Sequence, residues 1–248
     1  MNKYINYNTI AQSYDETREV EDKVYSIIEM ILSPFEQDKI LEFGCGTGNY
    51  LNRLACSYST VSLFGIEKSI EMAQIAKQKI KQADIRIGDH IDIPFSSNSF
   101  NKIFSIDVIH HINELNIFFA NIYNLSCING LFIICTETDE QLAEKFWNKY
   151  FPSLYKKDKN RFHSVKTIIN EAGNCGWKYE KKYKIEEEKY STISDSIMNR
   201  IKKRTLSSLF LLSEHEYNMG VKDMEEDYNC HKIIHQKEGY TILIFRKD

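Results

Sequence analysis

Short apolar segments alternate with amphipathic ones over the middle of the chain. The apolar segments are rich in β-branched residues and predict strands at Lys39–Phe43, Val61–Ile66, Ile85–Gly88, Phe100–Ile106 and Leu131–Thr136. The segments between them predict helices at Asn49–Cys56, Ser69–Lys81 and Glu114–Leu125, with Ser69 as an N-cap. Strands that alternate with helices in this way are typical of a parallel sheet covered by helices on both faces.

The two ends of the chain follow a different pattern. Residues 1–32 predict helix, because apolar residues from Val24 to Ile31 recur at three-to-four spacing before Ser33-Pro34 ends the run. Beyond residue 138 helices are predicted at Gln141–Tyr155, Val165–Ala172, Thr192–Leu212 and Ser213–Asp227, and two more strands at Trp177–Ile185 and Tyr240–Phe245. We therefore expect one domain in three parts: an N-terminal helical cap (1–37), a core (38–138), and helices with closing strands (139–248).

Composition narrows the class of protein. The 248 residues hold 32 Lys+Arg against 35 Asp+Glu, so no basic excess supports a nucleic-acid coat. No apolar run is long enough to span a membrane, and the N-terminus lacks the apolar region of a secretory signal. The six cysteines are not spaced as zinc ligands, and reduced thiols are their simplest interpretation. We therefore expect a cytoplasmic protein with neither a metal site nor a membrane span.

Three of the ten glycines fall within five residues, in the segment Glu42-Phe43-Gly44-Cys45-Gly46-Thr47-Gly48. They lie where the first strand turns into the first helix, at the edge where a doubly wound sheet binds ligands. Glycine there lets the backbone turn sharply and approach a ligand closely. A dinucleotide fold would need its third glycine at position 49, where Asn49 stands, so a pyrophosphate cradle is disfavoured. A plain strand-to-helix turn is the structural alternative.

Acidic residues follow the second and third strands. Glu67 lies 21 residues after Gly46 (67 − 46), about the distance at which a carboxylate meets the hydroxyls of a ribose. Asp89 can accept a hydrogen bond from an exocyclic amine, while Ile91 offers an apolar face to a purine. A solvated charge at Glu67 and a loop turn at Asp89 are the alternatives. The favoured interpretation is a site for an adenosine.

Together these segments resemble a class I S-adenosylmethionine-dependent methyltransferase, and within that family the group that includes the ubiquinone/menaquinone-biosynthesis-type enzymes. The matching segments, within residues 38–137, are Ile40–Gly48, Gly65–Glu67, Gly88–His90, Ile91–Phe95 and Phe104–Ile112. The resemblance implies an α/β, Rossmann-like, doubly wound fold. Its sheet would be mostly parallel and seven-stranded, with an N-terminal helical cap and C-terminal helical insertions. S-adenosylmethionine would be the cofactor and S-adenosylhomocysteine its product.

The resemblance also implies which residues contact the methionine part of the cofactor. Gly44, Cys45 and Gly46 would line it, with Asn49 close by. Glu42 would reach the amine directly or through water.

The adenosine contacts implied by the resemblance come from the ends of the second and third strands. They involve Glu67, Lys68, Met72, Asp89, His90 and Ile91. Glu67 would hold the ribose hydroxyls, with Lys68 and Met72 beside it, and the last three residues would hold the adenine.

Two further parts of the chain complete the implied cofactor site. Ile106 and Asp107, at the end of the fourth strand, would lie near the methionine amine and the sulfonium. Asn6 to Arg18 is similar to the family's N-terminal helix, so Tyr14 and Arg18 would contact the carboxylate. An exposed helix face is the alternative for both residues.

Methyl transfer from a sulfonium is an in-line displacement, so orientation and the exclusion of water can supply most of the rate. A general base is needed only for an acceptor that is protonated at the working pH. His110 and His111 follow the fourth strand, and His111 is the candidate catalytic residue, with a structural histidine as the alternative.

Several features bear on the methyl acceptor. The Asn/Asp-Pro-Pro-Tyr/Phe motif of amino-methylating nucleic-acid enzymes is absent, because the three prolines are Pro34, Pro94 and Pro152. The densest basic run, Arg200 to Arg204, is interpreted as a solvated helix face. The N-terminal helix also resembles that of tRNA wobble-uridine methyltransferases. Aromatic residues between Phe146 and Phe162 predict either a lid over an apolar or ring-bearing small molecule, or ordinary packing.

The favoured function is therefore methyl transfer to a small-molecule acceptor. Methylation of RNA (tRNA) or protein is one alternative. A catalytically silent S-adenosylmethionine-binding protein is the other.

Overall fold

The computed structural model describes residues 7–248, and its strands form one seven-stranded sheet in the order β3-β2-β1-β4-β5-β7-β6. The strands are β1 (Lys39–Phe43), β2 (Ser62–Glu67), β3 (Ala83–Ile87), β4 (Phe100–Ile106), β5 (Ser126–Thr136), β6 (Trp177–Ser191) and β7 (Ile234–Lys247). β1 to β5 pair in parallel, and β7 lies antiparallel between β5 and β6. The predicted doubly wound, mostly parallel α/β sheet is confirmed.

The helices precede, connect and follow these strands. They are η1 (Tyr7–Ile10), α1 (Ala11–Thr17), α2 (Asp22–Leu32), α3 (Asn49–Ser57), α4 (Ile70–Lys79), η2 (Ile109–His111), α5 (Leu115–Leu125), α6 (Asp139–Ala143), η3 (Phe146–Lys149), α7 (Leu154–Lys159), α8 (Val165–Asn174), α9 (Asp195–Lys202), η4 (Ser207–Leu211) and α10 (Glu214–Asn229). None of them, within residues 7–248, combines the length and the apolar character needed to cross a bilayer.

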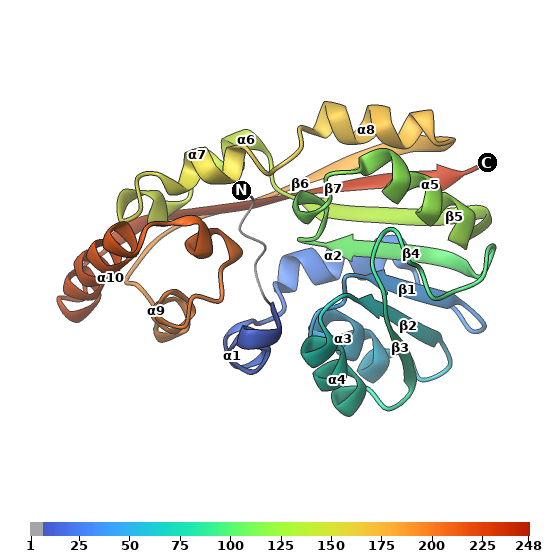
Figure 1. Ribbon diagram of the computed structural model, residues 1–248, viewed down its shortest axis with the longest axis horizontal. Coiled ribbons are helices and arrows are strands. Elements are labelled where there is room, and N and C mark those ends of the chain that lie inside the picture. Colours follow the sequence, from blue (N-terminus) through green and yellow to red (C-terminus); the bar gives the residue numbers. More distant parts are fainter. Residues whose placement is uncertain (1–6) are drawn as a thin grey trace.

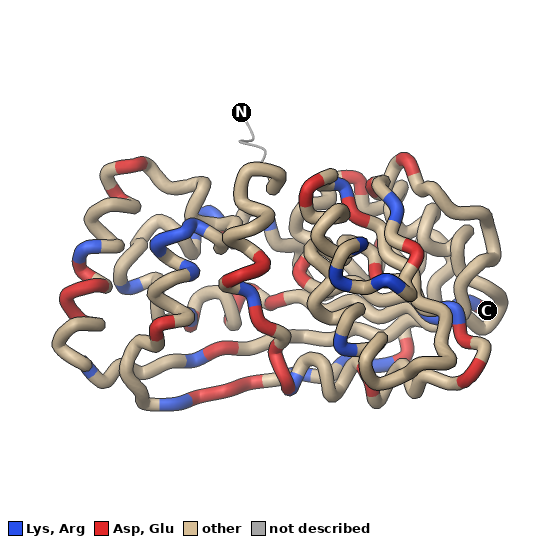
Figure 2. Tube along the Cα trace, turned by 90° about the horizontal axis from the view of Figure 1, so that it is seen from below, with Lys and Arg blue, Asp and Glu red and all other residues tan. Residues whose placement is uncertain are grey.

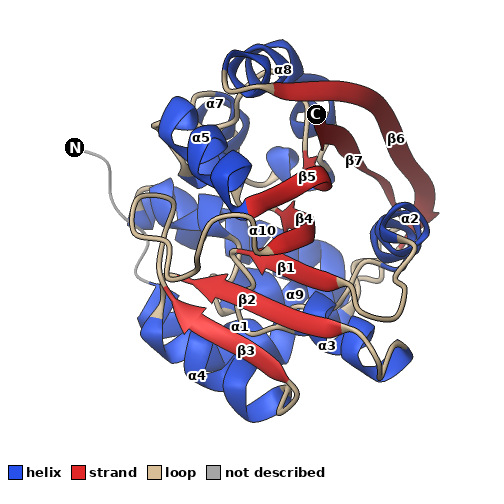
Figure 3. Cartoon of the chain, turned by 90° about the vertical axis from the view of Figure 1, so that its right-hand side faces the viewer, coloured by secondary structure: helices blue, strands red, loops and turns tan. Residues whose placement is uncertain are grey.

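Helices cover both faces of the sheet (Figures 1 and 3). α2, α3 and α4 pack on one face, and α5 and α8 pack on the other. Successive residues of a strand pack into the cores on opposite faces of the sheet. In β5, Ile133 packs into the core beneath α2, α3 and α4, and its neighbours Phe132 and Ile134 pack into the core beneath α5 and α8. A strand buried on both faces must be apolar throughout, which explains the unbroken apolar runs in the sequence.

The β6–β7 pair continues far beyond the rest of the sheet. The last residue of β5, Thr136, pairs with Thr241, whereas β7 already begins at Ile234. Figure 1 shows that this extension leads to the group of helices that includes α7, α9 and α10. These helices enclose a third core, in which Phe151 and Met224 are fully buried. We call this unit the C-terminal cap; it comprises α6, η3, α7, α9, η4, α10 and the β6–β7 extension.

Three predicted helices are interrupted in the structure. The first breaks between α1 and α2, and residues 1–6 lie outside the described part. The segment Gln141–Tyr155 is divided into α6, η3 and α7, partly because Pro152 cannot extend a helix through its own nitrogen. The segment Thr192–Leu212 is divided into α9 and η4, with Arg204 between them at a φ of 50°. These segments bend around the C-terminal cap's own core, so periodicity did not reveal where they end.

Both closing strands are longer than predicted. β6 continues from Ile185 to Ser191, and β7 begins six residues before Tyr240. The added residues of β6 are mostly charged and exposed, whereas those of β7 include the buried Ile234, Gln236 and Gly239 between more polar, less buried positions. Apolar runs alone therefore could not predict them.

Candidate active site

The glycine-rich turn after β1 has three residues with positive φ: Gly44 (75°), Gly46 (54°) and Gly48 (80°). A Cβ on Gly44 would lie 2.4 Å from Val108, and one on Gly48 would lie 2.7 Å from Ile80, so these two glycines are needed for internal packing. A Cβ on Gly46 would meet nothing closer than 3.9 Å. Gly46 is thus the glycine that opens onto free space, where a ligand can approach the backbone.

Glu67, at the end of β2, is directed at this turn. Its carboxylate accepts hydrogen bonds from the backbone N–H groups of Gly46 and Ser69, each at 2.8 Å. Burial raises the pKa of Glu67, and those N–H groups oppose the shift. The side chains nearest to the open side of Gly46 are Tyr14 and Met72. An acidic acceptor beside an open backbone turn fits the ribose and methionine parts of S-adenosylmethionine.

Glu42 lies beneath the same turn. Its side chain is buried and accepts a hydrogen bond from the backbone N–H of Leu51, in the first turn of α3, at 3.1 Å. Burial raises the pKa of Glu42 well above its ordinary value. Cys45 is also buried, and its backbone N–H bonds to the carbonyl of Ile66 at 3.0 Å. In this structure Glu42 fixes the start of α3, and its contact with the cofactor amine stays a prediction.

Asp89 forms a turn at the end of β3. Its carboxylate accepts hydrogen bonds from the backbone N–H groups of Ile91 at 2.9 Å and Asp92 at 3.0 Å, and pairs with Lys68 at 3.0 Å. Partial burial raises the pKa of Asp89, but these N–H groups and Lys68 have the larger combined effect and lower it to about 2. Ile91 is 62% exposed. The hydrogen bonds of Asp89 within the turn are compatible with its predicted contact with adenine. The turn leaves the apolar side chain of Ile91 exposed, where it can contact a purine ring.

His90 is fixed to α5 on both sides. Its Nε2 lies 3.1 Å from a carboxylate oxygen of Glu114, and its carbonyl accepts a hydrogen bond from the Asn121 amide at 2.8 Å. The structure therefore places Glu67, Lys68, Met72, Asp89, His90 and Ile91 along the ends of β2 and β3, as their predicted role requires.

The N-terminal helix α1 lies over the end of β4. An ion pair of 2.5 Å joins Arg18 to Asp107, which has a φ of 56°. Asn49 donates to the backbone carbonyl of Arg18 at 2.7 Å, and the Tyr14 ring lies beneath the guanidinium. Ile106, just before Asp107, is buried. Tyr14, Arg18, Asn49 and Asp107 therefore meet in one place, although they come from three separate segments.

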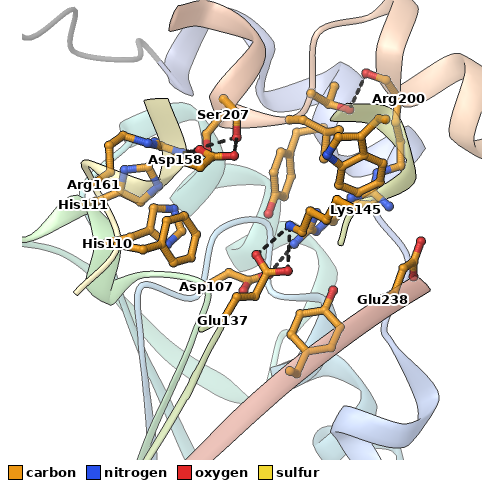
Figure 4. A pocket seen from close by; sticks show the side chains of 18 of the residues that line it. Asp107, His110, His111, Glu137, Lys145, Asp158, Arg161, Arg200, Ser207 and Glu238 are labelled. Atoms are coloured by element: carbon orange, nitrogen blue, oxygen red, sulfur yellow. Dashed lines mark hydrogen bonds and ion pairs between the residues drawn. The ribbon is translucent and has the colours of Figure 1, made fainter. Parts of the chain in front are cut away.

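A cavity with about 770 Å³ of empty space, part of it open to solvent, adjoins Asp107. Its walls come from the ends of β4 and β5, from β7, from the N-terminal segment and from the C-terminal cap. Figure 4 shows His110, His111 and Arg161 on one side of it and Arg200 and Glu238 on the other. The lining is predominantly polar and charged, so this is not the apolar pocket that an aromatic lid would make.

Unmet hydrogen bonds concentrate at this cavity. Within residues 7–248 eight buried side-chain N or O atoms lack a partner, and four of them belong to residues that line it. The four are Asp107 Oδ1, His110 Nδ1, Arg161 Nε and Arg200 Nε. A buried polar atom without a protein partner is costly, so these four atoms are candidates to bind a ligand or water in the cavity.

The histidine pair lies on the cavity wall in η2. The Nε2 of His111 is 2.9 Å from the Tyr7 hydroxyl, and the His110 ring stacks on Phe162 with centroids 4.2 Å apart. The enclosing protein and the charge of Arg161 lower the pKa of His111 to about 4. Burial and His111 lower the pKa of His110. Both rings are therefore neutral at pH 7, as a proton acceptor must be.

Two interpretations of the C-terminal third need correction. Arg200 does not belong to a solvated face, because it lines the cavity, while Ile201 is buried in the third core. Most of the predicted lid aromatics, such as Phe146, Tyr150 and Phe151, pack into that core, so the packing alternative holds for them. Only Trp147 and Phe162 of the lid candidates line the cavity.

Sequence reasoning missed most of the polar residues of the cavity. They include Glu137, Lys145, Asp158 and Arg161. Glu137 directly follows β5, and the position after a strand end was the signal that could have identified it. The other three lie in the C-terminal cap, whose short helices leave no such marker.

Comparisons with known proteins agree with this geometry. Residues 41–134 match the family model described as "Methyltransferase domain". An uncharacterized methyltransferase from Anoxybacillus flavithermus is 34% identical over 111 residues, which cover 42% of this chain and 51% of that protein. The chain thus spans about half the length of the curated relatives that it matches first.

Solved structures share the fold over nearly the whole chain. A candidate methyltransferase from an antibiotic biosynthesis pathway of Anabaena variabilis has a TM-score of 0.70 at 20% identity, covering 94% of this chain and 99% of its own. Geranyl diphosphate C-methyltransferase from Streptomyces coelicolor has a TM-score of 0.58 at 11% identity, with 100% and 86% covered. The match over residues 41–134, together with the fold and the glycine turn described above, indicates an S-adenosylmethionine-dependent methyltransferase domain in this part of the chain.

Proposed function

We propose that the protein transfers the methyl group of S-adenosylmethionine to a small molecule bound in the cavity beside Asp107. The observation that carries the proposal is the position of this cavity between the strand ends and the two helical caps. In this assignment residues 38–138 hold the cofactor, and residues 1–37 and 139–248 enclose the acceptor.

Different side chains have different roles in the proposed reaction. S-adenosylmethionine, when bound, supplies a methyl group on a positively charged sulfur that is already activated for displacement. Gly46, Glu67 and Asp89 bind and orient it, and Arg18 with Tyr14 covers the methionine end. The caps exclude water and align the acceptor with the methyl group, which is the main requirement of an in-line displacement.

His111 is the proposed proton acceptor where the acceptor must lose a proton. Its ring faces the cavity and is neutral above pH 4 to 5. The Tyr7 hydroxyl holds the ring at 2.9 Å, so Tyr7 acts as a positioning residue. A base with so low a pKa accepts a proton readily only from a comparably acidic group of the acceptor.

The proposed subgroup is supported by sequence motifs, and the proposed acceptor class is supported by the distribution of charge. The motifs from Ile40 to Ile112 resemble the ubiquinone/menaquinone-biosynthesis-type enzymes, and we propose membership in that group on those motifs. A small acceptor is favoured over RNA or protein, because Figure 2 shows acidic and basic positions interspersed along the strands and helices rather than gathered by sign. A silent cofactor-binding protein would share the Glu67 and Gly46 contacts.

Calorimetry and methyl transfer separate these functions. Calorimetry with S-adenosylmethionine should give micromolar affinity, and no binding at ~1 mM would overturn every variant of the proposal. Transfer of labelled methyl should then be measured to a metabolite panel, bulk tRNA and denatured cell protein. The proposal expects label in small molecules alone. Label in tRNA or protein would show that the acceptor is a macromolecule and not a small molecule. Tight binding of S-adenosylmethionine without methyl transfer to any of the three samples would favour a catalytically silent cofactor-binding protein.

A further inference from the structure

Four basic side chains line the cavity, and three of them are neutralised by ion pairs. The pairs are Arg18 with Asp107 at 2.5 Å, Lys145 with Glu137 at 2.6 Å, and Arg161 with Asp158 at 2.7 Å. In each pair the acid is part of the same cavity wall. The wall therefore supplies its own counter-charge at these three positions, and a ligand need not.

Arg200 is the exception. It projects from α9 into the cavity, and its Nε is buried without a hydrogen-bond partner. Within residues 7–248 no ion pair joins its guanidinium to an acid. Its helix neighbours Met198 and Ile201 are buried in the third core, so the packing of α9 directs Arg200 toward the cavity.

A buried guanidinium N–H without a hydrogen-bond acceptor is unfavourable, because it has lost water without gaining a partner. Burial, with the positive charge of Arg18, lowers the pKa of Arg200, while Glu21 and Glu238 oppose that shift. Neither acid is hydrogen-bonded to Arg200 among the described residues. The two acids stabilise the positive charge of the guanidinium, while its Nε stays without a hydrogen-bond partner.

The opposite wall of the cavity offers one further donor. The Nε of Arg161 is likewise buried without a partner, and its Nη2 donates to Asp158 at 2.7 Å and to Ser207 at 3.1 Å. A planar guanidinium with free N–H groups matches the two oxygens of a carboxylate or phosphate.

We propose that the methyl acceptor carries an anionic group, a carboxylate or a phosphate, which Arg200 binds through its unpartnered N–H group. This inference rests on the proposed methyl transfer to a small molecule. It makes Arg200 a specificity-determining residue that discriminates against neutral acceptors of the same shape.

The first test needs no acceptor and uses two arginines of one segment. Arg204 pairs with Glu214 at 2.6 Å and stacks on Tyr217 at 3.6 Å, so Arg204→Gln should lower the melting temperature by about 3 °C. Arg200→Gln should leave it unchanged or raise it, because the unliganded protein gains nothing from an unpaired charge. A loss for Arg200→Gln equal to that for Arg204→Gln would make Arg200 structural and overturn the proposal.

The second test measures anion binding without turnover. Protein saturated with S-adenosylhomocysteine is titrated with sodium acetate or sodium phosphate against sodium chloride at equal ionic strength. Either anion should raise the melting temperature of wild type and Arg204→Gln by at least about 2 °C and leave Arg200→Gln unchanged. A response to acetate alone identifies a carboxylate site, and a response to phosphate alone identifies a phosphate site. An equal response in Arg200→Gln, or none in wild type, overturns the proposal.

The acceptor found by the methyl-transfer panel gives the third test. Arg200→Gln should raise the KM for that acceptor at least tenfold and leave the calorimetric affinity for S-adenosylmethionine unchanged. An acceptor without an anionic group, or an unchanged KM, overturns the inference while methyl transfer itself stands. Failure of cofactor binding instead removes the proposed function, so the two failures are distinct.

Discussion

The cofactor side of this protein and its C-terminal cap are built on different principles. Around Gly46 the site consists mainly of backbone and of side chains that immediately follow strands, such as Glu67 and Asp89. The cavity wall instead gathers single side chains from many elements, such as Arg161 and Arg200, over a core of its own. The difference teaches that cofactor recognition leaves a linear pattern in the sequence, whereas acceptor recognition here depends on packing.

The sharpest test of this division removes the centre of the C-terminal core. Phe151 is fully buried and faces Gly220, on which a Cβ would lie 2.3 Å from the ring. Phe151→Ala should lower the free energy of unfolding by about 3–5 kcal/mol, as measured by urea denaturation. Affinity for S-adenosylmethionine in the folded protein should stay within twofold. Phe35→Ala, at a 74% exposed position, is the matched control and should change stability by less than about 0.5 kcal/mol. A parallel loss of cofactor affinity would contradict the division.

The second prediction concerns the cofactor side. Glu67→Ala removes the acceptor of two backbone N–H bonds and the predicted partner of the ribose. Affinity for S-adenosylmethionine should fall about a hundredfold, or about 3 kcal/mol, in calorimetry. Glu71→Ala, on the exposed side of α4, should leave affinity unchanged. A change of less than threefold in Glu67→Ala would refute the ribose assignment.

The third prediction is a pH effect of Glu42. Because burial raises its pKa in the folded protein, the native state holds this proton more tightly than the unfolded chain does. The contribution of protonated Glu42 to the free energy of unfolding is therefore fully present below about pH 4.5. It declines as the pH rises through the raised pKa of Glu42 in the folded protein. Glu42→Gln keeps an acceptor for Leu51 and should be more stable than wild type at pH 8 by about 1–2 kcal/mol, with the gain vanishing near pH 4.

Urea denaturation of both proteins across that pH range checks this sign. A gain that grows toward low pH would contradict it. Weaker binding of S-adenosylmethionine by the same variant at pH 8 would support the predicted contact of Glu42 with the amine.

The smallest expected effects come from alanine substitutions at two glycines of the same turn. Gly46→Ala adds a methyl group toward the open side and should weaken S-adenosylmethionine by about fivefold to tenfold, or about 1 kcal/mol. Gly48→Ala places its Cβ against Ile80 and should lower stability without changing the affinity of the folded protein. Calorimetry and thermal melting together separate the two results. The reverse pattern would show that Gly48, and not Gly46, faces the ligand.

Much of the fold was predictable because its pattern is local. The strand from Lys39 to Phe43 and the N-cap at Ser69 follow from a few adjacent residues, and both are confirmed. The limits of β6 and β7 were not predictable, since neither extension contains a continuous apolar run. Helix breaks near Pro152 and Arg204 depend on which core each residue faces, and that is a tertiary property.

The sequence by itself determined that this chain is a doubly wound α/β protein whose glycine turn and strand-end acids suit an adenosine cofactor. Those features recur at fixed spacings because backbone geometry at strand ends permits few solutions. Only the tertiary structure decided that Arg200 turns inward, that the lid aromatics form a core, and that Tyr7 meets His111. Side chains as far apart along the chain as Arg18 and Arg200 share a cavity through packing, which no local spacing records.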